Sequence, residues 1–208
     1  MSRPASSYPV ATILLLALPA LLLLPAAPAA ARPDFLVGLR AGTADLSGDL
    51  YDLVYGETLS PLGAQVEVRW TRAFVRLAWE TAEADGFLLQ PPGPPTLLPV
   101  PPEPTELSLD LLHATGGWSQ DGGRWGWFAG AGLTFADAEE SNVIGTASAS
   151  ESGYHAVAGG RLRFGARWEV GAEAMYVAVD DLLVAPPASS LSPDLDGVAA
   201  AATLAFRF

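Results

Sequence analysis

The chain has 208 residues and a formal net charge of −12, and Arg is its only strong base because it contains no Lys. A chain this acidic is repelled by the phosphate backbone of nucleic acids, which excludes a nucleic-acid partner. It also contains no Cys, which excludes a disulfide-stabilised scaffold and any thiolate metal site.

Residues 1–31 are predicted to be a cleavable signal peptide. Arg3 lies in a short polar opening, an apolar run covers Ala11 to Leu24, and small residues in an A-x-A pattern end at Ala31. The apolar run is too short for a membrane anchor helix, which needs about 20 residues. We therefore expect export, with cleavage near Ala31.

Residues 32–208 are long enough for one domain, and segments that alternate apolar and polar residues dominate them. A period of two indicates strands rather than helices. The eight predicted strands are, in chain order, Phe35–Gly42, Leu62–Trp70, Phe74–Ala82, Glu106–Trp118, Arg124–Ala136, Gly153–Phe164, Arg167–Val179 and Gly197–Phe208.

The connectors between these strands alternate in length. Three are tight, at residues 71–73, 119–123 and 165–166. Four are long, at about residues 43–61, 85–105, 137–152 and 180–196. The long connectors are acidic and contain no Arg, whereas most Arg residues lie near the tight turns. Long loops at one end and short turns at the other are typical of an outer-membrane barrel.

The alternation also separates charged from apolar residues. Eleven charged side chains can share one face, which we predict to be a charge network in the lumen: Arg40, Glu67, Arg69, Arg76, Glu80, Asp110, Arg161, Arg163, Glu169, Glu173 and Arg207. The opposite face carries no charge. An apolar outside around a charged inside is stable only in lipid, so the fold is predicted to be an all-β, eight-stranded, antiparallel, up-and-down transmembrane barrel.

Aromatic residues gather near the tight turns, where a girdle at the membrane interface is expected. The predicted girdle consists of Trp70, Trp118, Trp125, Trp127, Phe164 and Trp168.

One strand does not fit strict alternation. If Leu107, Leu109 and Leu111 face the lipid, then His113 faces the lipid as well and Trp118 faces the lumen. A bulge at Leu111 and Leu112 would reverse the later residues. We predict that bulge.

This pattern resembles the eight-stranded OmpA-like, OmpX-like and opacity-type outer-membrane barrels. The resemblance covers residues 32–208 as a pattern, without a sequence-specific motif, and implies a location in the bacterial outer membrane. It also implies that a terminal aromatic strand is read by the barrel-assembly machinery, at positions matched here by Leu204, Phe206 and Phe208. Outer-membrane lipid, lipopolysaccharide and periplasmic chaperones are the other implied partners, and a monomer is expected.

For function, the charged lumen has two interpretations: a plug of paired charges, or a narrow ion path. We expect a structural or surface-interacting barrel that is not an enzyme and has no cofactor or metal. The alternatives are a narrow pore or an OmpW-like conduit for small hydrophobic molecules, a lipid A-modifying enzyme using His113 or His155, and a soluble lipocalin-like carrier. The acidic loops have two interpretations: they are simply solvated, or they bind Ca²⁺ or Mg²⁺. The Pro-rich stretch from Gln90 to Pro104 also has two: it is a display loop, or it is a tolerated insertion.

Overall fold

The computed structural model describes residues 33–47, 58–88, 103–143, 145–179 and 196–208. They all lie in one compact unit, Pro33–Phe208. The predicted signal peptide and most of the Pro-rich stretch lie outside the described residues. Among the described residues, no helix is long and apolar enough to cross a membrane.

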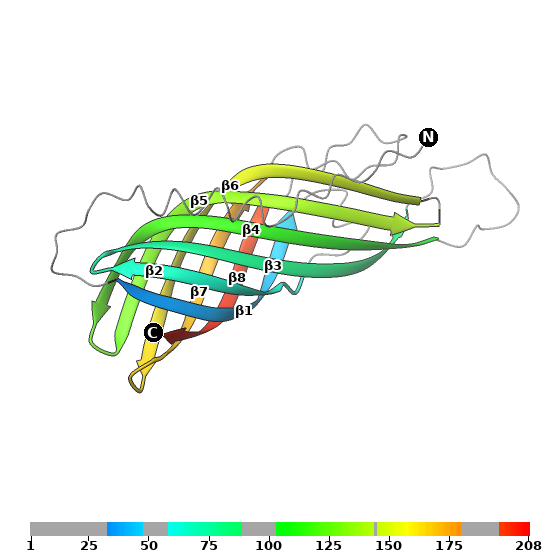
Figure 1. Cartoon of the computed structure of the whole chain (residues 1–208). Helices are drawn as coiled ribbons and strands as arrows, with labels where there is room; N and C mark the ends of the chain where they lie inside the picture. The colour runs from blue at the N-terminus through cyan, green and yellow to red at the C-terminus, as the bar shows by residue number, and fades with distance from the viewer. Residues whose placement is uncertain (1–32, 48–57, 89–102, 144, 180–195) are drawn as a thin grey trace, which may run out of the picture. The chain divides into compact units, whose positions relative to one another are not determined.

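Eight antiparallel strands form a closed barrel in which each strand pairs with its neighbours in sequence and the last pairs with the first (Figure 1). This confirms the predicted architecture. The strands are β1 (Asp34–Ser47), β2 (Leu62–Trp70), β3 (Ala73–Leu88), β4 (Glu103–Gly122), β5 (Trp125–Asn142), β6 (Gly145–Phe164), β7 (Trp168–Ala178) and β8 (Asp196–Arg207).

One end of the barrel, called here the turn end, carries the three tight connections between β2 and β3, β4 and β5, and β6 and β7. Gly123 and Gly165 lie in two of these turns with φ of 76° and 65°. A side chain with a Cβ is strained in that left-handed region, so Gly suits both positions. The opposite end, called here the loop end, carries the other connections.

The connection between β5 and β6 differs from the prediction. A long loop is expected over residues 137–152, but β5 continues to Asn142 and β6 begins at Gly145. Cross-strand pairing is regular up to the pair of Asn142 and Gly145. The side chain of Asn142 accepts a hydrogen bond of 3.3 Å from the Gly145 amide. The polar residues of this segment therefore belong to a long hairpin.

The bulge predicted in β4 is wrong. Pairing is regular on both sides of Leu112, which faces Trp79 on β3 and Phe135 on β5. Leu107, Leu109 and Leu111 are buried, on the same face as His113. The inward and outward positions of the whole strand are therefore the reverse of those predicted. Its leucines face the lumen, and no bulge is needed to bring His113 inside.

The outward face of the barrel is an apolar band with an abrupt edge toward the loop end. Large apolar side chains such as Leu39, Leu133 and Val198 are more than half exposed on this face. Beyond the pairs that join Trp79 to Leu112 and Leu112 to Phe135, the next outward row across β3 to β6 is Thr81, Asp110, Asp137 and Ser150. The first outward carboxylates thus follow directly after Trp79, Leu112 and Phe135, and Phe87, farther along β3, is also exposed.

Strands β3 to β6 continue past this edge as a regular four-stranded sheet (Figure 1). From the row that contains Asp110 and Asp137 outward, β3 and β4 each add eight residues beyond the band and β5 and β6 each add six, or roughly 20–25 Å at about 3.3 Å per residue. We call this part of the sheet the extension. Its outer face carries exposed acidic residues, namely Glu83, Asp85, Glu106, Asp110, Asp137 and Glu139.

Candidate functional site

The lumen near the turn end contains a continuous chain of alternating acidic and basic side chains. Five strands and the end of β4 contribute to it, so the barrel wall holds each group in place. The order of ion pairs is Glu80, Arg40, Glu173, Arg76, Glu67, Arg69, Glu169, Arg163, Asp121 and Arg161. We call it the lumen chain. It contains five Arg and five carboxylates, so its formal charges balance.

Arg76 lies at the centre of the lumen chain. Its Nε and Nη2 donate hydrogen bonds of 3.0 and 2.9 Å to Glu67, and its Nη1 donates one of 2.6 Å to Glu173. The guanidinium carbon also lies 4.7 Å from the ring centroid of Phe128 and 5.4 Å from that of Phe74. Paired charges and aromatic faces together offset the desolvation of a buried guanidinium.

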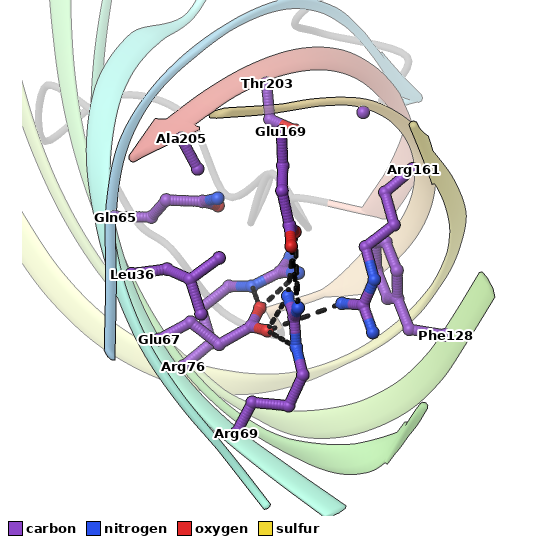
Figure 2. Close-up of a pocket in the computed structure, with 11 residues that line it drawn as sticks. Leu36, Gln65, Glu67, Arg69, Arg76, Phe128, Arg161, Glu169, Thr203 and Ala205 are labelled. Atoms are coloured by element: carbon purple, nitrogen blue, oxygen red, sulfur yellow. Dashed lines mark hydrogen bonds and ion pairs between the residues drawn. The ribbon is translucent and has the colours of Figure 1, made fainter. Parts of the chain in front are cut away.

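Arg69 connects the two walls of the lumen. It pairs with Glu67, two residues before it on β2, at 2.6 Å, and with Glu169 across the lumen on β7 at 3.1 Å. Figure 2 shows Arg69 and Glu169 approaching each other from opposite sides, with Glu67, Arg76 and Arg161 around them. Arg161 closes a loop in the lumen chain at 3.5 Å from Glu67.

A cavity of about 20 Å³ lies beside these groups. That volume is enough for about one water molecule. Its lining includes the side chain of Gln65, whose Oε1 is buried and has no hydrogen-bond partner among the described residues (Figure 2). This cavity beside the lumen chain therefore has room for little more than one water molecule.

Both histidines of the chain lie in the next layer toward the loop end. His113 and His155 are 1% exposed, and their rings meet edge to face at 5.2 Å. The hydroxyl of Thr134 lies between them, 2.9 Å from His113 Nδ1 and 3.0 Å from His155 Nδ1. His113 Nε2 is 3.4 Å from Glu80, which joins this layer to the lumen chain.

Beyond the histidines, the described part of the lumen is mainly apolar, and the buried pair of Thr105 and Glu140, joined by a hydrogen bond of 2.9 Å, lies farther toward the loop end. Leu109, Leu111, Met175, Val177 and Val179 are buried there in one hydrophobic cluster with small residues of the neighbouring strands. The cluster also includes Leu59, which precedes β2 and pairs with Ala44 of β1 through backbone hydrogen bonds of 2.8 and 3.0 Å. The described lumen thus has two halves, a charged one at the turn end and a mainly apolar one at the loop end.

Ten of the eleven side chains predicted for the lumen network face the lumen or its rim. Eight of them are buried: Arg40, Glu67, Arg69, Arg76, Glu80, Arg161, Glu169 and Glu173. Arg163 and Arg207 are partly exposed at the turn end, where Arg207 pairs with Asp34 at 3.4 Å. Asp110 is a correction: it is exposed on the outside of β4, because the leucines beside it take the inner face.

The prediction omitted Asp121, which pairs with Arg161 at 3.0 Å and also with Arg163. The sequence predicts a turn over residues 119–123, whereas β4 continues to Gly122 and brings Asp121 opposite Gly126. The signal in the sequence was the excess of Arg over carboxylates among the residues predicted for this end of the lumen.

The six residues predicted for the aromatic girdle lie at the turn end. Five are exposed, from 38% for Trp118 to 68% for Trp125, and Trp70 is half-buried. Ring contacts at 4.8 Å between Trp118 and Trp127 and at 6.5 Å between Phe164 and Trp168 join neighbouring strands. This row extends along β8, where Phe206 contacts Trp168 at 5.1 Å.

The residues of the predicted assembly signal lie at the end of the chain, in β8 and directly after it. Leu204 and Phe208 are exposed on the outside, Phe206 is half-buried, and Phe206 contacts Phe208 at 5.1 Å. The Phe208 amide donates a hydrogen bond of 3.0 Å to the Phe35 carbonyl and so continues the seam between β8 and β1.

Within the described ranges, no three His, Asp or Glu side chains converge in a way that could hold a metal ion. Closed backbone pairing, an apolar outer band, interfacial aromatics and a lumen filled by paired charges together define a transmembrane β-barrel.

The chain belongs to the family of outer membrane protein beta-barrel domains, whose family model matches residues 14–208. Membership of this family places the protein in the bacterial outer membrane. Among curated proteins, none matches the sequence.

Solved structures with the same fold include two outer-membrane proteins. OprG from Pseudomonas aeruginosa is 11% identical, with a TM-score of 0.55, over 86% of this chain and 97% of OprG. Ail, the attachment invasion locus protein of Yersinia pestis, is 14% identical, with a TM-score of 0.50, over 85% of this chain and 98% of Ail. Similarity at these identities is evidence of the shared fold alone.

Proposed function

We propose that the protein is a non-enzymatic outer-membrane barrel that presents a rigid acidic surface for interaction with a positively charged partner outside the membrane. The observation that carries the proposal is the extension. Four paired strands hold its outward carboxylates on one sheet, and like charges are opposed across strands at Asp110 and Asp137 and at Asp85 and Glu106. Such pairs destabilise a sheet unless cations approach them.

The lumen supports a structural rather than a transport role. Paired charges occupy the turn-end half and mainly apolar side chains occupy the loop-end half. An eight-stranded barrel has an interior that side chains can fill completely. We infer that the barrel is a closed scaffold, and that His113 and His155 stabilise the lumen rather than act on lipid, because both are buried inside it.

The negative charge of the extension predicts that its partner is positively charged. The Ail structure contains the heparin analogue sucrose octasulfate, which is a polyanion. The exposed carboxylates here favour the opposite, a cationic peptide or a protein surface rich in Lys and Arg.

The test is binding of a fluorescent oligo-lysine peptide to the protein in nanodiscs of uncharged phosphatidylcholine. One variant changes Glu83, Glu106 and Glu139 to Gln and Asp85, Asp110 and Asp137 to Asn. We expect salt-sensitive binding by the wild type and at least a tenfold loss in the variant. The single variant Asp45→Asn, on the outside of β1, is the control and should bind as the wild type does. Equal binding by the wild type and the variant with six substitutions contradicts the proposal.

The apolar half of the lumen favours a second candidate, a conduit for small hydrophobic molecules. Leu109, Met175 and Val177 line the interior with apolar surface where a hydrophobic molecule would be accepted. Protein-dependent uptake of a hydrophobic fluorescent probe by vesicles, lost when Leu109→Trp narrows the interior, would favour the conduit over the closed scaffold.

A further inference from the structure

Each of the three tight turns carries one exposed arginine at an equivalent position. Arg72, Arg124 and Arg167 are the last residues before β3, β5 and β7, respectively. In each case the arginine carbonyl accepts a backbone hydrogen bond of 2.7 or 2.8 Å from the strand that follows the hairpin, at Ser119, Arg163 and Arg207. The barrel thus fixes three cationic residues around its turn-end rim.

These arginines differ from the arginines of the lumen in their partners. The lumen arginines are all paired with carboxylates, whereas Arg72, Arg124 and Arg167 are exposed and have no carboxylate partner among the described residues. Arg167 lies 5.8 Å from the ring centroid of Phe206. An arginine is charged at every physiological pH, so this rim presents three unneutralised positive charges.

The aromatic girdle sets the depth of these charges. Arg124 directly precedes Trp125, Arg167 directly precedes Trp168, and Arg72 follows Trp70 by two residues. Exposed interfacial aromatics lie at the level of lipid headgroups. The three guanidinium groups are therefore within reach of the headgroup layer.

We propose that the turn-end rim binds the phosphate groups of anionic phospholipids in the leaflet that surrounds it. A guanidinium can donate two parallel hydrogen bonds to a phosphate, a geometry that Arg offers and Lys does not. The membrane is favoured over a soluble polyanion because aromatic side chains flank each arginine at the interface. At the loop end the outward charges are acidic, so the two leaflets meet opposite charges.

The experiment measures which lipid surrounds the turn end. All proteins carry Trp79→Phe, because Trp79 is the tryptophan near the loop-end edge of the band and the other five lie at the turn end. The protein is reconstituted into phosphatidylcholine vesicles that contain 20% of either brominated phosphatidylglycerol or brominated phosphatidylcholine. Bromine quenches the fluorescence of tryptophans that it contacts, so the ratio of the two quenching curves gives the relative affinity.

We expect brominated phosphatidylglycerol to be preferred about fivefold for each arginine that contacts a headgroup, and the preference to fall at high salt. The triple variant with Arg72, Arg124 and Arg167 changed to Gln should lose the preference, whereas the triple Lys variant should keep part of it. Heat-dependent gel migration checks that each variant is folded. If the triple Gln variant does not fold, the three single Gln variants should each lower the preference.

Two results would overturn the proposal. Equal quenching by the two brominated lipids in the wild type would leave a soluble polyanion as the partner of these arginines. An unchanged preference in the folded Gln variants, triple or single, would place the lipid contact elsewhere. Neither result affects the proposed role of the extension, which is measured at the other end in uncharged lipid.

Discussion

Arg76 shows at the level of one residue why the lumen chain must be complete. Its guanidinium bonds to both Glu67 and Glu173, and each of these carboxylates also pairs with a further arginine. Burying a charge without a partner is costly, while a buried pair in good geometry roughly compensates its own desolvation. The lumen chain is therefore better described as a set of mutually dependent groups than as separate salt bridges.

Replacing Arg76 by Met is expected to lower the free energy of unfolding by about 3–5 kcal/mol, because Glu67 and Glu173 each lose a partner in a buried site. Urea titration of the barrel in lipid vesicles, followed by tryptophan fluorescence, measures this change. In vesicles of uncharged phosphatidylcholine, which offer no anionic headgroup, Arg72→Gln at an exposed turn is the control and should change the value by less than about 0.5 kcal/mol. Similar effects of the two substitutions would contradict a stabilising role of the lumen chain.

Leu109 distinguishes the observed phase of β4 from its reverse. The side chain is 1% exposed inside the barrel, so Leu109→Ala should leave a cavity and cost about 2–5 kcal/mol. Leu133→Ala is the matched control, because Leu133 is 56% exposed on the outside of β5. The same urea titration should show a clearly smaller loss for Leu133. A loss for Leu109 no larger than that for Leu133 would mean that Leu109 also faces outward and that β4 has the reverse phase.

At the level of the strand, alternation alone defines two faces but not which face is inside. For strands with charged residues, such as Arg76 and Glu80 on β3, the inside can be predicted because lipid excludes charge. In β4, leucines are compatible with lipid and equally with an apolar lumen, so Leu109 carries no information about the inside. His113 and Thr115 do carry it, since a regular strand places both on the same side as Leu109 and Leu111.

A pair of arginine substitutions on the outside of β4 should locate the edge of the apolar band. Ala114→Arg places a charge within the band and should cost about 2–4 kcal/mol, whereas Ser108→Arg lies on the extension and should cost about 0–1 kcal/mol. Ser108 lies two residues past Asp110, the first outward carboxylate of β4. Both free energies come from urea titration in the same vesicles. Equal costs would mean that lipid also covers the extension.

For the whole barrel, the strand count and closure follow from the sequence, but the pairings inside the lumen do not. Arg69 and Glu169 are 100 residues apart in the chain, yet Arg69 Nη1 and Glu169 Oε1 lie 3.1 Å apart. Which levels of opposite walls meet depends on the tilt and stagger of the strands. The alternation of residues in the sequence specifies neither the tilt nor the stagger. The residues of the lumen chain were therefore largely predictable, whereas the pairs that they form were not.

The filled lumen predicts electrical silence. In planar bilayers the wild-type protein should give no stable conductance, because charged and apolar side chains close the lumen in series. The double variant Arg76→Ala with Glu173→Ala removes a charge pair that spans the lumen between β3 and β7 and provides the comparison. Reproducible channel steps in the wild type would identify the lumen chain as an ion path.

The ion pairs of the lumen chain also bear on how the barrel folds, because they join strands that come together only when β1 pairs with β8. Arg40 on β1 finds its partners on β3 and β7, and Arg76 on β3 finds Glu173 on β7 at a separation of 97 residues. Contacts of such high contact order form late and slowly. A half-assembled sheet in lipid would expose these charges without their partners, so insertion and closure are expected to be one cooperative step. Open intermediates are therefore expected to be high in free energy, because the charges of the lumen chain find all their partners only in the closed barrel.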